Sequence, residues 1–155
     1  MNALKKSTVS AIAVVDLADE LISRKMIDQT TLKVISVNLE KIYQEHHSGQ
    51  SVIEKRLPET DILSLWEIAT SVKTKPTLGV DIGQSVNVKA KGLLANWLSC
   101  CDTLKQALTI FHDNIAMLNE AEYWTIKQES NIIKLSFKFS SKYTYPVMAI
   151  ERSMV

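Results

Sequence analysis

The sequence has little of several residue types that mark specialised protein classes. Its 155 residues include two cysteines, three prolines, four glycines and three histidines, and 6% of the residues are aromatic. Cys100 and Cys101 are adjacent, so they rarely pair with each other, and two cysteines do not make a disulfide framework. With no CxxC pair, the composition also argues against zinc. We therefore expect free thiols near a helix end and no bound metal.

Long apolar runs and an excess of one charge are also absent. No stretch reaches the ~18 apolar residues that a membrane-spanning helix needs, and Asp16, Asp19 and Glu20 interrupt the first apolar run, which does not fit a signal peptide. Lys and Arg total 18 against 17 Asp and Glu, whereas nucleic-acid-binding domains usually carry a clustered basic excess. We expect a cytoplasmic, soluble protein that enters no membrane and does not bind DNA by itself.

Hydrophobic residues make up 46% of the chain and charged residues 23%, as in an ordinary globular protein. A chain of 155 residues suggests one domain, 1–155, that can fold without a disulfide or a metal. Apolar residues recur at helical spacing through most of the sequence. The helices expected from this spacing cover 9–24, 29–35, 37–45, 58–72, 92–99 and 103–118.

Between these helices we expect less regular segments. A polar loop is predicted at 46–51 and a turn at 76–83, while 86–91 reads as a short strand or irregular backbone. Backbone that needs glycine, such as Gly79 and Gly83, is held either by a tight turn or by close packing.

The last third of the chain changes period. Residues 123–128 and 132–140 read as two strands joined by a turn at Ser130-Asn131, the second strand having one buried and one solvated face. The predicted fold class is α+β, mostly helical, with a small antiparallel sheet near the C-terminal end. A helix is expected to begin at Val147, and because no C-cap signal follows it, we expect a chain truncated within this helix.

No catalytic motif is present. The chain has no GxSxG, no GxGxxG and no P-loop, and Cys101 and His112 match no nucleophile pattern. His46 and His47 lie in the predicted polar loop without a supporting ligand arrangement, which favours solvated residues over metal ligands. The sequence therefore predicts no enzyme and no cofactor.

Large aromatic and sulfur-containing side chains lie on or beside the apolar faces. They either pack in the core or line a pocket for a small apolar or amphipathic ligand, and the sequence leaves both interpretations open. The candidate ligand-binding residues are Trp66, Trp97, Phe111, Met117 and Trp124.

Three blocks in series carry a resemblance to a known family. They are LWEIA at 65–69, PTLGVDIG at 76–83 and GLLANWLSCCDTLKQAL at 92–108. In order and spacing they resemble the N-terminal sensor domain, arabinose-binding-like, of one branch of AraC/XylS-type transcriptional regulators, over about 57–146. The chain departs from that pattern at Ala95, Asn96, Cys101-Asp102 and Asn114.

The resemblance implies the sensor half of a bacterial transcription factor. A small-molecule effector bound by this domain would change how a C-terminal pair of helix-turn-helix motifs is presented to DNA. DNA would then be contacted only through that C-terminal domain, and the sensor domain could form a homodimer. The alternatives are a dimerisation module that binds no ligand and, less favoured, a small enzyme that uses Cys101 or His112.

Overall fold

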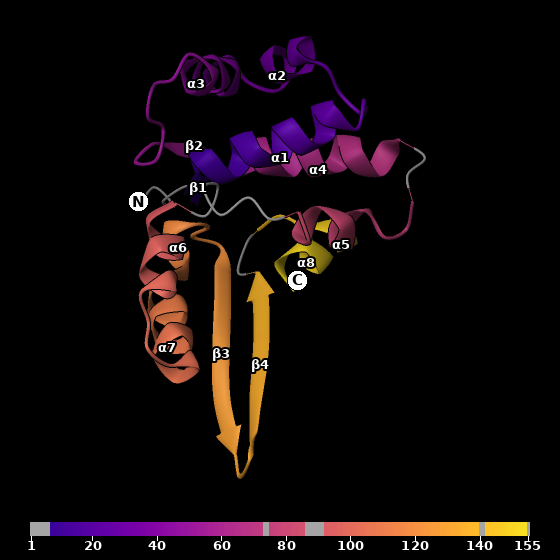
Figure 1. The fold of residues 1–155 in the computed structure, drawn as a ribbon. Helices are drawn as coiled ribbons and strands as arrows, with labels where there is room; N and C mark the ends of the chain where they lie inside the picture. Colours follow the sequence, from indigo (N-terminus) through magenta and orange to yellow (C-terminus); the bar gives the residue numbers. More distant parts are fainter. Residues whose placement is uncertain (1–6, 73–74, 86–91, 140–141, 155) are drawn as a thin grey trace, which may run out of the picture.

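The computed structural model describes residues 7–72, 75–85, 92–139 and 142–154. Within them the chain is mixed α+β, with helices predominating and two antiparallel sheets of two strands each, which confirms the expected fold class (Figure 1). The N-terminal part contains β1 (Thr8–Ser10), α1 (Ala11–Ser23), α2 (Gln29–Ile35), α3 (Val37–His47), β2 (Arg56–Pro58) and α4 (Glu59–Ser71). The remainder contains α5 (Leu78–Gly83), α6 (Gly92–Ser99), α7 (Leu104–Asn114), the 3₁₀ turn η2 (Ile115–Met117), β3 (Glu122–Glu129), β4 (Ile132–Phe139) and α8 (Val147–Ser153).

Helix α1 is the centre of the hydrophobic core. It packs beside α4, with α2 and α3 on one side of the pair and α5 and α8 on the other (Figure 1). Most apolar side chains of α1 are buried, Ile12 among them. Asp16, Asp19 and Glu20 of the same helix are half-buried, so protein covers most of the helix circumference.

The second and third helices begin at polar caps. Asp28, directly before the helix expected at 29–35, accepts a hydrogen bond from the Thr31 amide at 2.9 Å and forms a capping box with Thr31. The polar loop predicted at 46–51 is wrong at its start, because His46 and His47 form the last turn of α3. Tyr43 and His47, one turn apart, both lie against Asp19 of α1, at 2.7 Å and 3.0 Å, and this contact favours a longer helix.

The first small sheet, β1–β2, was not predicted. Its strands are three residues long, too short for a period to be read from the sequence. Arg56 joins this sheet to η2: its guanidinium donates to the carbonyl oxygens of Thr8, Ala116 and Met117. Segments about sixty residues apart are thereby held together.

The turn predicted at 76–83 is partly wrong, since Leu78–Gly83 form the short helix α5. This helix packs closely on α8 (Figure 1). A Cβ at Gly79 would lie 2.2 Å from the Met148 carbonyl oxygen, so glycine is required there by close packing rather than by a turn. The strand considered at 86–91 lies outside the described residues.

The hairpin β3–β4 projects from the core, with α6 and α7 alongside it (Figure 1). Its turn falls at Ser130-Asn131 as predicted, and Ser130 adopts a φ of 54°. The expected burial of one face is wrong for most of β4, where only Phe137 and Phe139 are half-buried. Helix α7 is shorter than predicted, because the chain tightens to the 3₁₀ turn η2 after Asn114. No helix in the described ranges has the length and apolarity to cross a bilayer.

Candidate ligand-binding site

A cavity of about 220 Å³ lies where the core meets the base of the hairpin. Its walls come from segments far apart in the chain, from Val9 in β1 to Ser153 in α8. For comparison, an engineered apolar cavity of about 150 Å³ admits benzene. The space therefore suits a small molecule rather than a peptide.

Most of the wall is apolar. Trp66, on α4, is 1% exposed overall, and Phe111 closes the α7 side. Smaller aliphatic side chains complete this surface: Ala13, Ile62, Ile82, Leu94, Ala95, Leu98, Ile115, Leu118 and Ala149. An apolar group of a ligand would lose water against these side chains, which is favourable.

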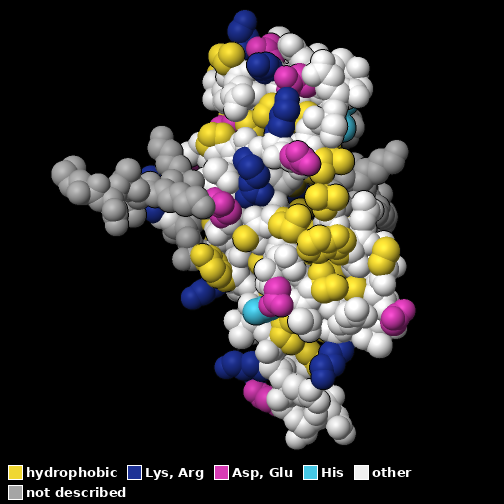
Figure 2. All heavy atoms as spheres, turned by 90° about the vertical axis from the view of Figure 1, so that its left-hand side faces the viewer, with side chains coloured by type: hydrophobic (Ala, Val, Ile, Leu, Met, Phe, Trp, Pro, Cys, Tyr) yellow, Lys and Arg dark blue, Asp and Glu magenta, His cyan; other side chains and the backbone are white. Residues whose placement is uncertain are grey.

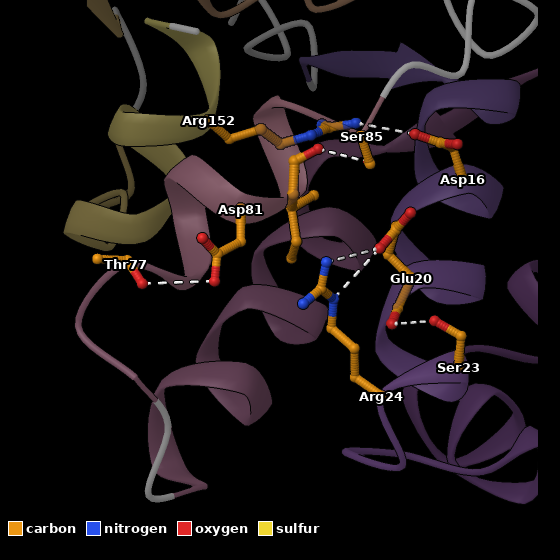
Figure 3. Close-up of polar contacts among 9 residues, drawn as sticks. Asp16, Glu20, Ser23, Arg24, Thr77, Asp81, Ser85 and Arg152 are labelled. Atoms are coloured by element: carbon orange, nitrogen blue, oxygen red, sulfur yellow. Dashed lines mark hydrogen bonds and ion pairs between the residues drawn. The ribbon is translucent and has the colours of Figure 1, made fainter.

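An ion pair crosses one side of the cavity. Arg152 of α8 donates from a terminal guanidinium nitrogen to Asp16 Oδ2 of α1 at 3.3 Å (Figure 3). The side chains are 24% and 11% exposed, so the pair is largely removed from water. Burial lowers the pKa of Arg152, while Asp16 and Glu122 act in the opposite direction. A guanidinium stays protonated throughout the ordinary pH range, so the side chain remains cationic.

Glu122, the first residue of β3, adds a second carboxylate. Its Oε1 accepts a hydrogen bond of 2.7 Å from the Trp124 indole. Burial raises the pKa of Glu122, although the Trp124 hydrogen bond and the charge of Arg152 lower it. The protein groups around Glu122 therefore do not fully compensate its charged form for the loss of water.

A second polar group lies deeper in the wall. The Tyr145 hydroxyl donates to Glu59 Oε1 at 2.7 Å and accepts from Asn119 Nδ2 at 3.2 Å. All three residues are less than 9% exposed. Burial raises the pKa of Tyr145, so the hydroxyl keeps its proton. These hydrogen bonds fix the Tyr145 side chain in the wall and leave its hydroxyl little capacity for a hydrogen bond to a ligand.

The structure brings together only part of the residue set expected from the sequence. Trp66 and Phe111 line the cavity. Trp124 lies outside the lining but packs edge-to-face on Phe111, with ring centroids 5.2 Å apart. Met117 is half-buried outside the lining, and Trp97 is 48% exposed on the surface of α6. The assignment of these five residues to ligand binding stays a prediction.

Sequence reasoning missed the charged part of this wall. In the sequence Asp16 reads only as a charge that interrupts an apolar run, and neither Arg152 nor Glu122 stands out from its neighbours. The one available signal was a carboxylate, Asp16, between apolar residues of α1, where Ala13 and Asp16 lie one turn apart on the cavity side. Its partner is 136 residues away in the chain, so no local pattern identifies it.

The residues considered for other chemistry lie elsewhere. Cys100 is exposed and Cys101 half-buried at the end of α6, and His112 is exposed beside Asp113. In the part of the chain that the structure describes, no group of three or more His, Cys, Asp or Glu residues is placed to hold a metal ion.

Comparison with known proteins adds no identification. No protein-family model matches the chain, and no curated protein matches its sequence.

Proposed function

We propose that this chain is a ligand-sensing domain of an AraC/XylS-type transcriptional regulator, in which a small molecule bound in the cavity alters DNA binding by a C-terminal domain outside these 155 residues. The observation that carries the proposal is the cavity itself, with an apolar wall and a charged side in one space. This combination is typical of small-molecule sites, where apolar surface supplies affinity and a few polar groups fix orientation. The three-block resemblance supplies the regulator class.

The position of the cavity suits a sensor. Its wall includes α8 through Ala149 and Arg152, and α8 otherwise rests on α5 and α4. A ligand that binds one arrangement of α8 better than another would shift the population toward that arrangement. The coupling free energy of such switches is typically about 1–3 kcal/mol.

The test measures the melting temperature of the protein in the presence of each member of a panel of amines, amino acids, fatty acids and neutral metabolites. We expect at least one compound to stabilise the fold by about 2.7 kcal/mol at 100 times its Kd. For a domain of this size, that gain raises Tm by roughly 5–10 °C.

Two variants show where such a compound binds. Ala13→Leu fills the cavity and should abolish the stabilisation, whereas Ala116→Leu, on the exposed side of η2, should preserve it. If no compound raises Tm, or if Ala13→Leu leaves the effect intact, the cavity is not the sensing site.

A second candidate function is that of a dimerisation module without a ligand. We define the α6–α7 face as Leu93, Trp97 and Leu104, which are 44%, 48% and 72% exposed. Figure 2 shows hydrophobic side chains gathered on this side of the molecule. Exposed apolar patches of this kind often mark protein–protein contacts.

A further inference from the structure

Among the described lining residues, carboxylates outnumber cationic side chains. Asp16 and Glu122 contribute two carboxylates, and Arg152 contributes the one cationic side chain among the described lining residues. Arg152 is paired with Asp16 and also feels the charges of Glu122 and Glu20. Glu122, by contrast, forms no ion pair with a described residue.

One carboxylate oxygen of Glu122 is available to a ligand. Oε1 is engaged by the Trp124 indole, whereas Oε2 makes no hydrogen bond to any described residue. Among the described residues, the fully buried side-chain oxygens without a partner are Asp61 Oδ2 and Glu151 Oε2, so Glu122 Oε2 keeps some accessible surface. Glu122 itself is one of the residues that line the cavity.

Aromatic rings surround the same space. Trp66, Phe111, Phe139 and Tyr145 all contribute to the lining, and the rings of Phe139 and Tyr145 are stacked with centroids 3.7 Å apart. Aromatic faces attract cations, and the attraction is strongest where water is excluded.

We propose that the cavity binds a small organic amine as a monocation, with its ammonium group at Glu122 and its apolar group against Trp66 and Phe111. This inference deepens the proposed function and rests on it. An ammonium group neutralises the Glu122 carboxylate and donates a hydrogen bond to its Oε2. It also restores solvation to a carboxylate that burial disfavours.

Arg152 offers donors to an anion, but the surrounding charges oppose one. A ligand carboxylate would compete with Asp16 for the guanidinium and would add a further negative charge near Glu122. Like charges in a site of low dielectric repel strongly. A neutral alcohol of the same shape would avoid this repulsion but would gain no ion pair.

The test compares three probes of nearly equal size: 2-phenylethylamine, 2-phenylethanol and phenylacetate. Binding to the whole chain is measured by calorimetry at pH 7. We expect the amine to bind at least about tenfold more tightly than either other probe. Equal or tighter binding of phenylacetate would overturn the amine assignment.

Glu122→Gln keeps an oxygen that accepts from the Trp124 indole while it removes the charge. It should weaken amine binding about tenfold and leave 2-phenylethanol unchanged, and Glu129→Gln, exposed at the far end of β3, should change neither. Amine binding that survives Glu122→Gln would also overturn the proposal.

Failure of the amine assignment and failure of the sensor proposal give different results. If only the alcohol or phenylacetate binds, and Ala13→Leu removes that binding, the cavity is a ligand site with a different charge preference. If no probe binds, the amine assignment is wrong, and the broader stability panel decides whether the cavity senses any ligand.

Discussion

Gly79 shows how a single missing side chain can set the packing of two helices. A Cβ at this position would lie 2.2 Å from the Met148 carbonyl oxygen and 2.9 Å from Glu151 Cβ. Because the first of these atoms is backbone, it cannot move aside without shifting α8. The residue therefore determines how closely α8 approaches α5, and with it the position of Arg152 at the cavity.

We predict that Gly79→Ala destabilises the fold by about 1–3 kcal/mol through overpacking, despite the better helix propensity of alanine. In this variant, backbone amide hydrogen exchange should be faster in α5 and α8. Urea denaturation measures the change in the free energy of unfolding. Gly49→Ala is the matched control, because a Cβ added at Gly49 would meet no atom within 4 Å. The φ of +87° at Gly49 strains alanine, so any effect of this variant should stay near the end of α3. Unchanged exchange in α8 would contradict the prediction.

At the scale of secondary-structure elements, a series of rings connects the hairpin to the core. Phe111 of α7 meets Trp124 of β3, which stacks on Phe137 of β4 with centroids 4.9 Å apart. Phe139 continues the series to Tyr145, beside the buried Glu59. Since most other β4 side chains are exposed, these rings hold the hairpin in place.

We predict that Phe137→Ala lowers stability by about 2 kcal/mol, roughly half the cost at a fully buried site, because Phe137 is only half-buried. Loss of the stacked ring should expose Trp124 and shift tryptophan emission to longer wavelength. Lys138→Ala, on the opposite face of β4, is the control and should leave the emission unchanged. Similar emission spectra for the two variants would show that the rings do not anchor the hairpin.

At the scale of the whole molecule, apolar side chains are distributed unevenly. One buried cluster gathers apolar side chains from along most of the chain, the first being Val9 and the last Ala149. Helix α7 contains no fully buried residue, despite its clear amphipathic pattern. The α6–α7 face thus retains apolar surface that the rest of the described chain leaves uncovered.

We predict that this face mediates a homodimer, with sedimentation showing concentration-dependent association at micromolar to millimolar protein. Trp97→Lys should shift the chain to monomer, since it places a charge on the apolar surface. Val34→Lys is the control, because Val34 is 86% exposed on α2, away from this face. A monomer at every concentration, or equal effects of both variants, would exclude a dimer through α6 and α7.

The sequence by itself determined the elements whose signals are local. The starts of α2 and α7 beside polar residues, the turn at Ser130-Asn131 and the α+β class all depend on residues that are close together in the chain. Helix spacing also identified Trp66 and Phe111 as residues of apolar faces, and both line the cavity. Such features are predictable because neighbours in the chain are neighbours in space.

Only the tertiary structure decided the charged side of the cavity and the role of Gly79. Arg152 meets Asp16 across 136 residues, and Gly79 is constrained by a helix about seventy positions further along the chain. A periodicity reports which face of an element is apolar, but not which distant element covers it. The path of the chain therefore places Asp16 and Glu122 beside a guanidinium and an aromatic wall.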